Sequence, residues 1–133
     1  MKRAVVVFFC LLVSCSVLFG ELVYEDEQEF APETEFVFSL PANATEYKVN
    51  IQFAYQKSSS HIQGTFDCTL TDPDGETQSR TMRIRNPKRK RSQHAWIEKN
   101  VFRVVPKEGT YTLHIEEQGH SFRGRTVKLK IYR

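Results

Sequence analysis

The sequence predicts an all-β fold, an antiparallel β-sandwich of seven or eight strands in a jelly-roll or Greek-key arrangement. Apolar and polar residues alternate along several short segments, which is the period of a half-buried strand. Turn-forming residues separate these segments, and no segment repeats with the period of a helix. The 133 residues suit one domain, and 40% of them are hydrophobic, as in an ordinary globular protein.

Residues 1–20 have the layout of a secretory signal peptide. A basic start at Lys2 and Arg3 precedes an uncharged apolar run, and small residues then allow cleavage after Ser16 or after Gly20. Two alternatives stay open, an uncleaved membrane anchor and lipidation of Cys15 in a lipobox-like setting. No later segment is apolar enough to span a membrane, so we expect a protein that is secreted or lies in the lumen of the secretory pathway.

Residues 21–34 are rich in acidic side chains and contain no basic ones. Their apolar residues, among them Val23, Tyr24 and Phe30, follow no clear period. We expect an extended acidic arm, part of which pairs as an edge strand. A flexible acidic tail is the alternative.

The sandwich domain is predicted over residues 35–133 and opens with two alternating segments. Phe36, Phe38 and Leu40 share one side of the first segment. The second segment, 47–55, alternates without a break and is the clearest half-buried strand of the chain. Its inward residues are Tyr47, Val49, Ile51, Phe53 and Tyr55.

The middle of the domain is predicted as two strands joined by a tight turn. The segment 62–70 places Phe66, Cys68 and Leu70 on one side, and the weaker segment 77–85 turns Met82 inward. The sequence Asp72-Pro73-Asp74-Gly75 between them favours a turn, because proline presets φ, aspartate caps through its side chain and glycine accepts positive φ.

Three more strands complete the domain. They are expected at 95–105, 111–115 and 127–131, with a turn at Pro106-Lys107-Glu108-Gly109 between the first two. The order of the strands in the sheets does not follow from the periodicity.

Cys68 is the one cysteine that remains if Cys10 and Cys15 leave with the signal peptide, so an intramolecular disulfide is excluded in that case. Its side chain lies on the same side of the strand as Phe66 and Leu70, which predicts a buried core thiol. An intermolecular disulfide is the alternative. A catalytic thiol would need a base, and the sequence nominates none.

A basic cluster lies between residues 80 and 91. It contains Arg80, Arg83, Arg85, Lys88, Arg89, Lys90 and Arg91. A polyanion-binding site for a sulfated glycan or another acidic surface is the candidate function of this cluster, with Arg85, Lys88, Arg89, Lys90 and Arg91 as its residues. A solvated loop held to the acidic arm and a protease cleavage site are the alternatives. Aromatic residues for stacking on nucleic acid are scarce, so nucleic acid is not expected as a partner.

Other candidate sites are weaker. Asn43-Ala44-Thr45 is an N-glycosylation sequon in a predicted loop, and we expect Asn43 to carry a glycan in a eukaryotic secreted protein. Trp96 is expected to pack in the core or at an edge, with a carbohydrate platform as the alternative.

Metal binding is not expected from the sequence. Calcium could bind at Asp67, Asp72, Asp74 and Glu76, but the loop is too short for an EF-hand and its turn needs no metal. The four histidines are scattered, and no pair of them has the spacing of metal ligands.

Three landmarks in this order resemble a known family. They are Phe36-x-Phe38-x-Leu40-Pro41-x-Asn43-Ala44, then Leu70-x-Asp72-Pro73-Asp74-Gly75, and then Gly109-Thr110-Tyr111-Thr112-Leu113. The chain from Glu35 to Arg133 is similar to the GOLD domain, the lumenal β-sandwich of transmembrane cargo receptors that cycle between the endoplasmic reticulum and the Golgi. The resemblance implies a β-sandwich that binds other proteins.

The sequence also departs from that family. Its usual disulfide is absent, and the corresponding positions look like Tyr47 and His114. The coiled coil, membrane span and cytosolic tail do not appear, so the trafficking role does not transfer with the resemblance.

The function expected from the sequence is binding without catalysis. No glycine-rich phosphate loop, nucleophile elbow or zinc-protease motif is present, and no cofactor is implied. We expect a secreted or lumenal, GOLD-like module whose partner is another protein. The alternative is an extracellular polyanion or carbohydrate binder that uses residues 80–91.

Overall fold

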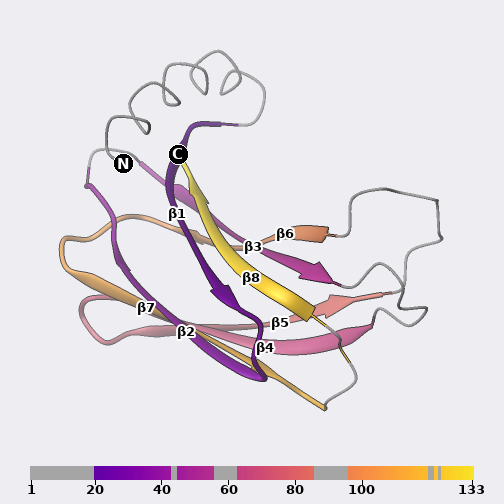
Figure 1. The fold of residues 1–133 in the computed structure, drawn as a ribbon. Coiled ribbons are helices and arrows are strands. Elements are labelled where there is room, and N and C mark those ends of the chain that lie inside the picture. The colour runs from indigo at the N-terminus through magenta and orange to yellow at the C-terminus, as the bar shows by residue number, and fades with distance from the viewer. Residues whose placement is uncertain (1–19, 43–44, 56–62, 86–95, 120–121, 123) are drawn as a thin grey trace.

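Eight β-strands make up the regular structure of the protein. The computed structural model describes residues 20–42, 45–55, 63–85, 96–119, 122 and 124–133. The strands are β1 (Leu22–Glu29), β2 (Glu33–Ser39), β3 (Tyr47–Tyr55), β4 (Gly64–Thr71), β5 (Thr77–Ile84), β6 (Trp96–Val104), β7 (Thr110–Glu117) and β8 (Gly124–Tyr132). They form two four-stranded antiparallel sheets that face each other (Figure 1). The predicted all-β sandwich is therefore confirmed.

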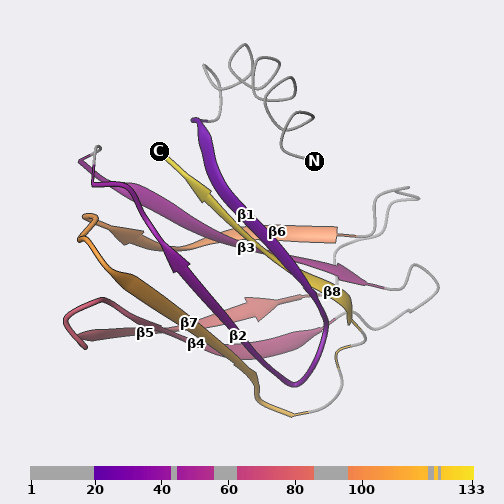
Figure 2. The same ribbon diagram turned by 60° about the vertical axis from the view of Figure 1, so that its left-hand side comes forward.

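The strand order is that of a jelly roll. One sheet runs β1-β8-β3-β6 and the other β2-β7-β4-β5. The chain changes sheet at every connection except the β4–β5 hairpin, so most consecutive strands lie on opposite sides of the core (Figure 2). Of the two arrangements that the sequence left open, the structure has the jelly roll.

The core follows the alternation in the sequence. Along β3, Tyr47, Val49, Ile51, Phe53 and Tyr55 are buried, as predicted, and the residues between them point outward. Met82 and Ile84 are the buried residues of β5. Burial of these side chains supplies the main driving force for packing the sheets together.

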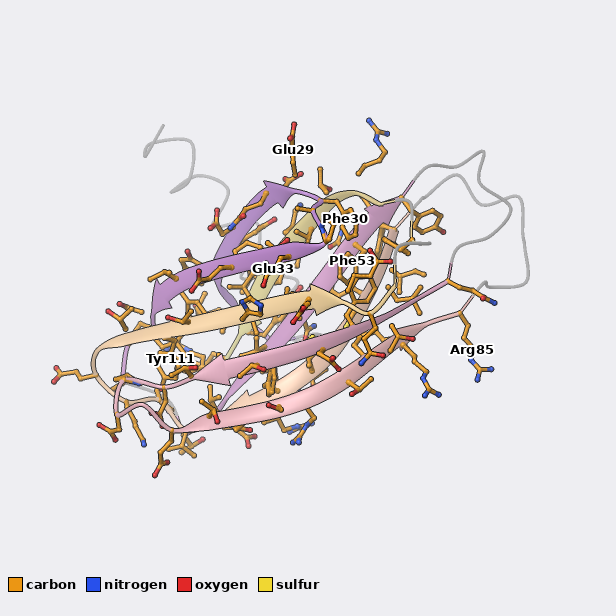
Figure 3. All side chains as sticks on the ribbon, turned by 90° about the horizontal axis from the view of Figure 1, so that it is seen from below. Glu29, Phe30, Glu33, Phe53, Arg85 and Tyr111 are labelled. Atoms are coloured by element: carbon orange, nitrogen blue, oxygen red, sulfur yellow. The ribbon has the colours of Figure 1, made fainter. Side chains whose placement is uncertain are left out.

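Aromatic rings join the two sheets at one end of the core. Phe53 of β3 stacks on Phe66 of β4 with 4.5 Å between ring centroids, and Phe122 and Phe30 meet both rings edge-on. Figure 3 shows Phe30 and Phe53 directed toward each other. This cluster links strands of both sheets with residues outside them.

The acidic segment 21–34 contains β1 and the first two residues of β2. β1 pairs with β8 along its length, from Leu22 to Glu29, so more of the segment is strand than the sequence indicated. The alternation of apolar and polar residues is weak in β1 because β1 is the edge strand of its sheet and its inward positions are only half-buried. Asp26 and Gln28 are opposite the inward-facing Leu129 and Val127, at the border of the core.

Candidate functional site

The end of β5 combines an open sheet edge with exposed arginines. β5 pairs with β4 alone among the described strands, which leaves its other edge without a neighbour in its sheet. The first five residues of β5 are all exposed. Arg83 and Arg85 are exposed on either side of the buried Ile84, and Figure 3 shows Arg85 extending away from the sandwich.

A hollow of about 290 Å³ lies at this end of the sheet. Arg83, Ile84 and Arg85 line it on one side. Gln63, Gly64 and Thr65 line it on the other, and Thr65 is directly opposite Arg83 in the β4–β5 register. A guanidinium group offers a planar set of N–H donors that matches sulfate, phosphate or carboxylate, so the hollow suits an anionic group.

The charges of Arg83 and Arg85 are not neutralised within the described part of the chain, where neither forms an ion pair with a carboxylate. The cations that do are Arg103, Lys107, Lys128, Lys130 and Arg133. Arg83 and Arg85 are therefore available to an external anion.

Arg80 has a different environment from the two arginines that follow it. It is opposite Cys68 in the register, which directs its side chain toward the inner side of the sheet. Its guanidinium lies 5.9 Å from the centroid of the Phe102 ring on β6. Arg80 therefore connects the edge strands β5 and β6, which belong to different sheets.

The structure places only part of the predicted anion site. Of its residues, Arg85 is described, whereas Lys88, Arg89, Lys90 and Arg91 lie outside the described residues, as does the sequon residue Asn43. The sequence analysis missed Gln63 and Thr65. The sequence could have indicated both residues from the turn at Asp72–Gly75. In a hairpin closed by that turn, residues equally far from it pair across the strands, which brings Thr65 opposite Arg83 and Gln63 level with Arg85.

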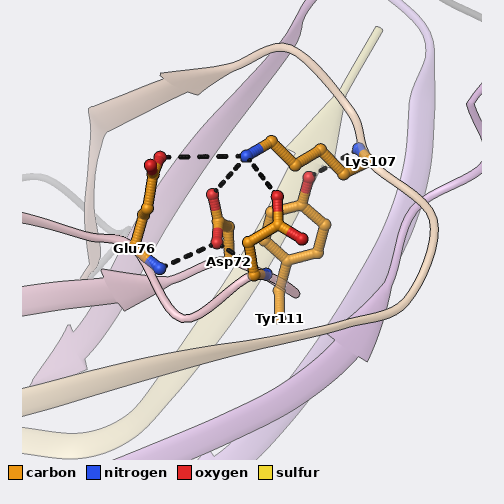
Figure 4. A network of polar contacts seen from close by, with 5 residues as sticks. Asp72, Glu76, Lys107 and Tyr111 are labelled. Atoms are coloured by element: carbon orange, nitrogen blue, oxygen red, sulfur yellow. Dashed lines mark hydrogen bonds and ion pairs between the residues drawn. The ribbon is translucent and has the colours of Figure 1, made fainter.

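Three of the four carboxylates considered for calcium, those of Asp72, Asp74 and Glu76, surround an ammonium group of the chain itself (Figure 4), whereas Asp67 lies with Gln118 and Thr81. Lys107 Nζ lies 2.8 Å from Asp72 Oδ2, 2.9 Å from Asp74 Oδ2 and 3.8 Å from Glu76 Oε1. The other Asp72 oxygen accepts hydrogen bonds from the backbone N–H groups of Asp74 and Glu76. The hydrogen bond from Lys107 holds the pKa of Asp72 below its ordinary value, and the two aspartates raise the pKa of Lys107.

This network joins two connections of the fold. Lys107 belongs to the β6–β7 connection, and its backbone N–H donates to Tyr111 Oη at 2.8 Å. Gly109 in the same connection has φ +123, and a Cβ there would lie 2.7 Å from Pro73 Cβ in the β4–β5 turn. The arrangement stabilises the turn, and we assign no ligand to it.

A second polar cluster covers the outer face of the other sheet. Glu98 of β6 accepts a hydrogen bond from Asn50 at 2.7 Å and lies 3.6 Å from Lys130. Tyr132 also donates to Glu98, and burial together with the Glu98 charge raises the pKa of Tyr132 to about 12. Both oxygens of Glu98 therefore have partners within the cluster. Trp96 begins the edge strand β6 on this face and is 45% exposed, so it lies at a sheet edge and not in the core, and the carbohydrate platform stays an alternative.

Cys68 is a buried free thiol, as predicted. Its exposed fraction is 0%, and burial followed by the Asp67 charge raises its pKa to about 12. The thiolate form that a nucleophile needs is therefore scarce at neutral pH.

Comparison with known proteins gives little guidance. No family model matches the chain, and no curated protein matches it. Among solved structures, the chain is similar to part of a family GH115 4-O-methyl-alpha-glucuronidase with specificity for decorated arabinogalactans, with 14% identity and a TM-score of 0.46. The match covers 86% of this chain but 16% of that enzyme, and no function follows from it. Within the described residues, no helix could cross a membrane.

Proposed function

We propose that this protein is a secreted or lumenal, non-catalytic binding module that holds a protein partner at the basic end of β5. The observation that carries the proposal is the pair Arg83 and Arg85, exposed beside a hollow at an open sheet edge. An extended acidic segment of a partner can add to the free edge of β5 through backbone hydrogen bonds. Its carboxylates would then meet the two guanidinium groups.

Two further observations support binding rather than catalysis. The thiol of Cys68, the chain's strongest nucleophile outside residues 1–20, is buried and protonated. The sequence landmarks resemble those of the GOLD domain, whose family binds other proteins in the secretory pathway. The signal-peptide layout of residues 1–20 supports the same route.

The test compares two double variants that each remove two exposed positive charges. Arg83→Gln/Arg85→Gln alters the proposed site, and Lys48→Gln/Arg125→Gln alters exposed positions on the other sheet. A photo-cross-linking residue at Ser79, on the open strand, would capture the partner in the native host. We expect a discrete cross-linked protein with the wild type and with the control pair, and none with the Arg83/Arg85 pair. Equal capture by all three would refute the proposal.

The second candidate function is binding of a sulfated glycan at the same hollow, which the continuation of the charge into Lys88–Arg91 favours. Immobilised heparin is the probe. Retention that falls steeply with salt, and is lost on changing Lys88 to Arg91 to alanine, would indicate the glycan. Retention that is weak and equal in all variants would leave the protein partner as the better assignment.

A further inference from the structure

Three side chains of types that can bind a metal lie close together on the outer face of the sheet β2-β7-β4-β5, away from the hollow. Glu33 of β2 is directly opposite Glu116 of β7, and His114 lies two residues before Glu116 on the same side of that strand. One ligand atom from each of the three lies within 4.8 Å of the others. His114 Nε2 is 3.1 Å from Glu33 Oε2.

The charges of the described residues around this cluster are unbalanced. Glu33, Glu116 and Asp67 occupy one row across three neighbouring strands, and like charges directly opposite each other destabilise a sheet. Asp67 is compensated by the Gln118 amide, at 2.8 and 2.7 Å, and by Thr81. Among the described residues, Glu116 has no hydrogen bond or ion pair, and Glu33 has one ion pair, with His114. A cation between Glu33 and Glu116 would relieve their repulsion.

The backbone at the cluster is held on both strands. Glu117 N donates to Pro32 O at 2.8 Å, directly beside the Glu33–Glu116 pair. The flanking residues Thr34 and Glu117 are buried, and the Glu117 carboxylate accepts a hydrogen bond from Phe122 N. The register therefore fixes the spacing of the three ligand positions, and metal binding needs only small adjustments of two exposed carboxylates and one half-buried imidazole.

We propose that Glu33, His114 and Glu116 bind a divalent transition metal, with zinc as the best fit. One imidazole nitrogen with two carboxylate oxygens is a ligand set that zinc accepts, whereas calcium and magnesium prefer oxygen ligands throughout. Three protein ligands leave a fourth position open to water or to a group of another molecule. The histidine spacing in the sequence could not indicate this site, because its ligands come from strands about 80 residues apart in the chain that only the jelly roll brings together.

The experiment is calorimetric titration of chelator-treated protein with zinc chloride. The variants are His114→Gln and Glu116→Gln, and Glu46→Gln is the control, because Glu46 is an exposed carboxylate paired with Arg103 elsewhere. We expect one zinc ion per chain for the wild type and the control, and at least a tenfold weaker affinity for each site variant. Circular dichroism would establish that each variant keeps the wild-type fold.

A second readout locates the metal independently of affinity. Zinc added to the wild type should shift the imidazole NMR signals of His114, assigned by their absence from His114→Gln, and leave other histidine signals in place. The proposal is overturned if zinc does not bind, or if binding is unchanged in His114→Gln. The Arg83/Arg85 tests do not involve these residues, so the two proposals can fail separately.

Discussion

At the residue scale, Gly124 is closely enclosed by aromatic rings at one end of the core. A Cβ at this position would lie 2.7 Å from Phe30 Cγ and 2.8 Å from Phe122 Cε2, closer than carbon atoms can approach. We predict that Gly124→Ala lowers the free energy of unfolding by about 1–3 kcal/mol, because the two rings must move out of their packed positions. Urea denaturation of both proteins measures the difference.

The double variant Gly124→Ala/Phe30→Leu is the matched test of that cause. Removing the Phe30 ring vacates space beside residue 124, so the alanine should cost less in this background than in the wild type. An equal cost in both backgrounds would show that the strain does not come from contact with Phe30.

Cys68 allows a prediction about reactivity. Because the thiol is buried and its pKa is raised to about 12, we expect a thiol reagent such as dithionitrobenzoate to leave the native protein unmodified at neutral pH. The same reagent should modify Cys68 rapidly in denaturant. Rapid reaction without denaturant, followed by absorbance, would show that β4 opens readily.

Residue-scale features were predictable where they depend on strand alternation. The burial of Cys68 follows from its place between Phe66 and Leu70. The direction of the His114 side chain does not follow from the sequence, because the alternation of its segment fits either register. In the structure Leu113 and Ile115 are buried, so His114 points outward. His114 lies on the outer face of β7, and Tyr47 points into the core from the other sheet, so these two positions do not face each other.

At the scale of elements, Lys107 holds the β4–β5 turn to the β6–β7 connection. We predict that Lys107→Met destabilises the protein at neutral pH, because Asp72, Asp74 and Glu76 lose their counter-ion. Arg103→Met is the control, since the exposed Arg103–Glu46 pair should contribute less than about 1 kcal/mol. A loss no larger than that of the control, by urea denaturation, would remove the structural role assigned to Lys107.

The same contact has a defined pH dependence. The pKa of Asp72 is lowered from its ordinary value of 3.8, chiefly by the hydrogen bond from Lys107. This stabilisation is present above pH 3.8 and is lost as the pH falls through the lowered value in the folded protein. The difference in stability between the wild type and Lys107→Met should therefore be constant near neutrality and shrink in acid, as denaturation at several pH values would show.

Most strands could be predicted from the sequence, because apolar and polar residues alternate along a strand that is buried on one face only. β3 is the clearest case, with bounds equal to those predicted. β1 could not be recognised in full, since the inward positions Asp26 and Gln28 lie at the sheet border and need not be apolar. The Lys107 network was also hidden, because it joins two turns that are distant in the sequence.

At the scale of the whole molecule, the strand order could not be read from the sequence. Alternation shows which side of a strand is inward but not which strand is its neighbour. The candidate sites differ in the same way. The Arg83–Arg85 hollow lies on a local hairpin, and its charges were visible in the sequence. The Glu33–His114–Glu116 cluster depends on pairing between β2 and β7, which only the fold supplies.

The jelly roll predicts that both sheets unfold together. Because nearly every connection crosses between the sheets, neither sheet can keep its strands when the other is lost. Phe66→Ala tests this from β4, where the ring is buried against Phe53 of the opposite sheet. We expect a loss of about 3–5 kcal/mol, whereas Val37→Ala, at a side chain 58% exposed, should change stability by less than about 0.5 kcal/mol.

The single tryptophan makes the coupling between the sheets measurable, because Trp96 lies in β6 of the sheet opposite to Phe66. Its fluorescence and the far-ultraviolet circular dichroism should report one transition with one midpoint. In Phe66→Ala both midpoints should fall by the same amount of denaturant, although the substitution lies in the other sheet. If the fluorescence midpoint stayed at its wild-type value while the dichroism midpoint fell, the sheets would be separate folding units.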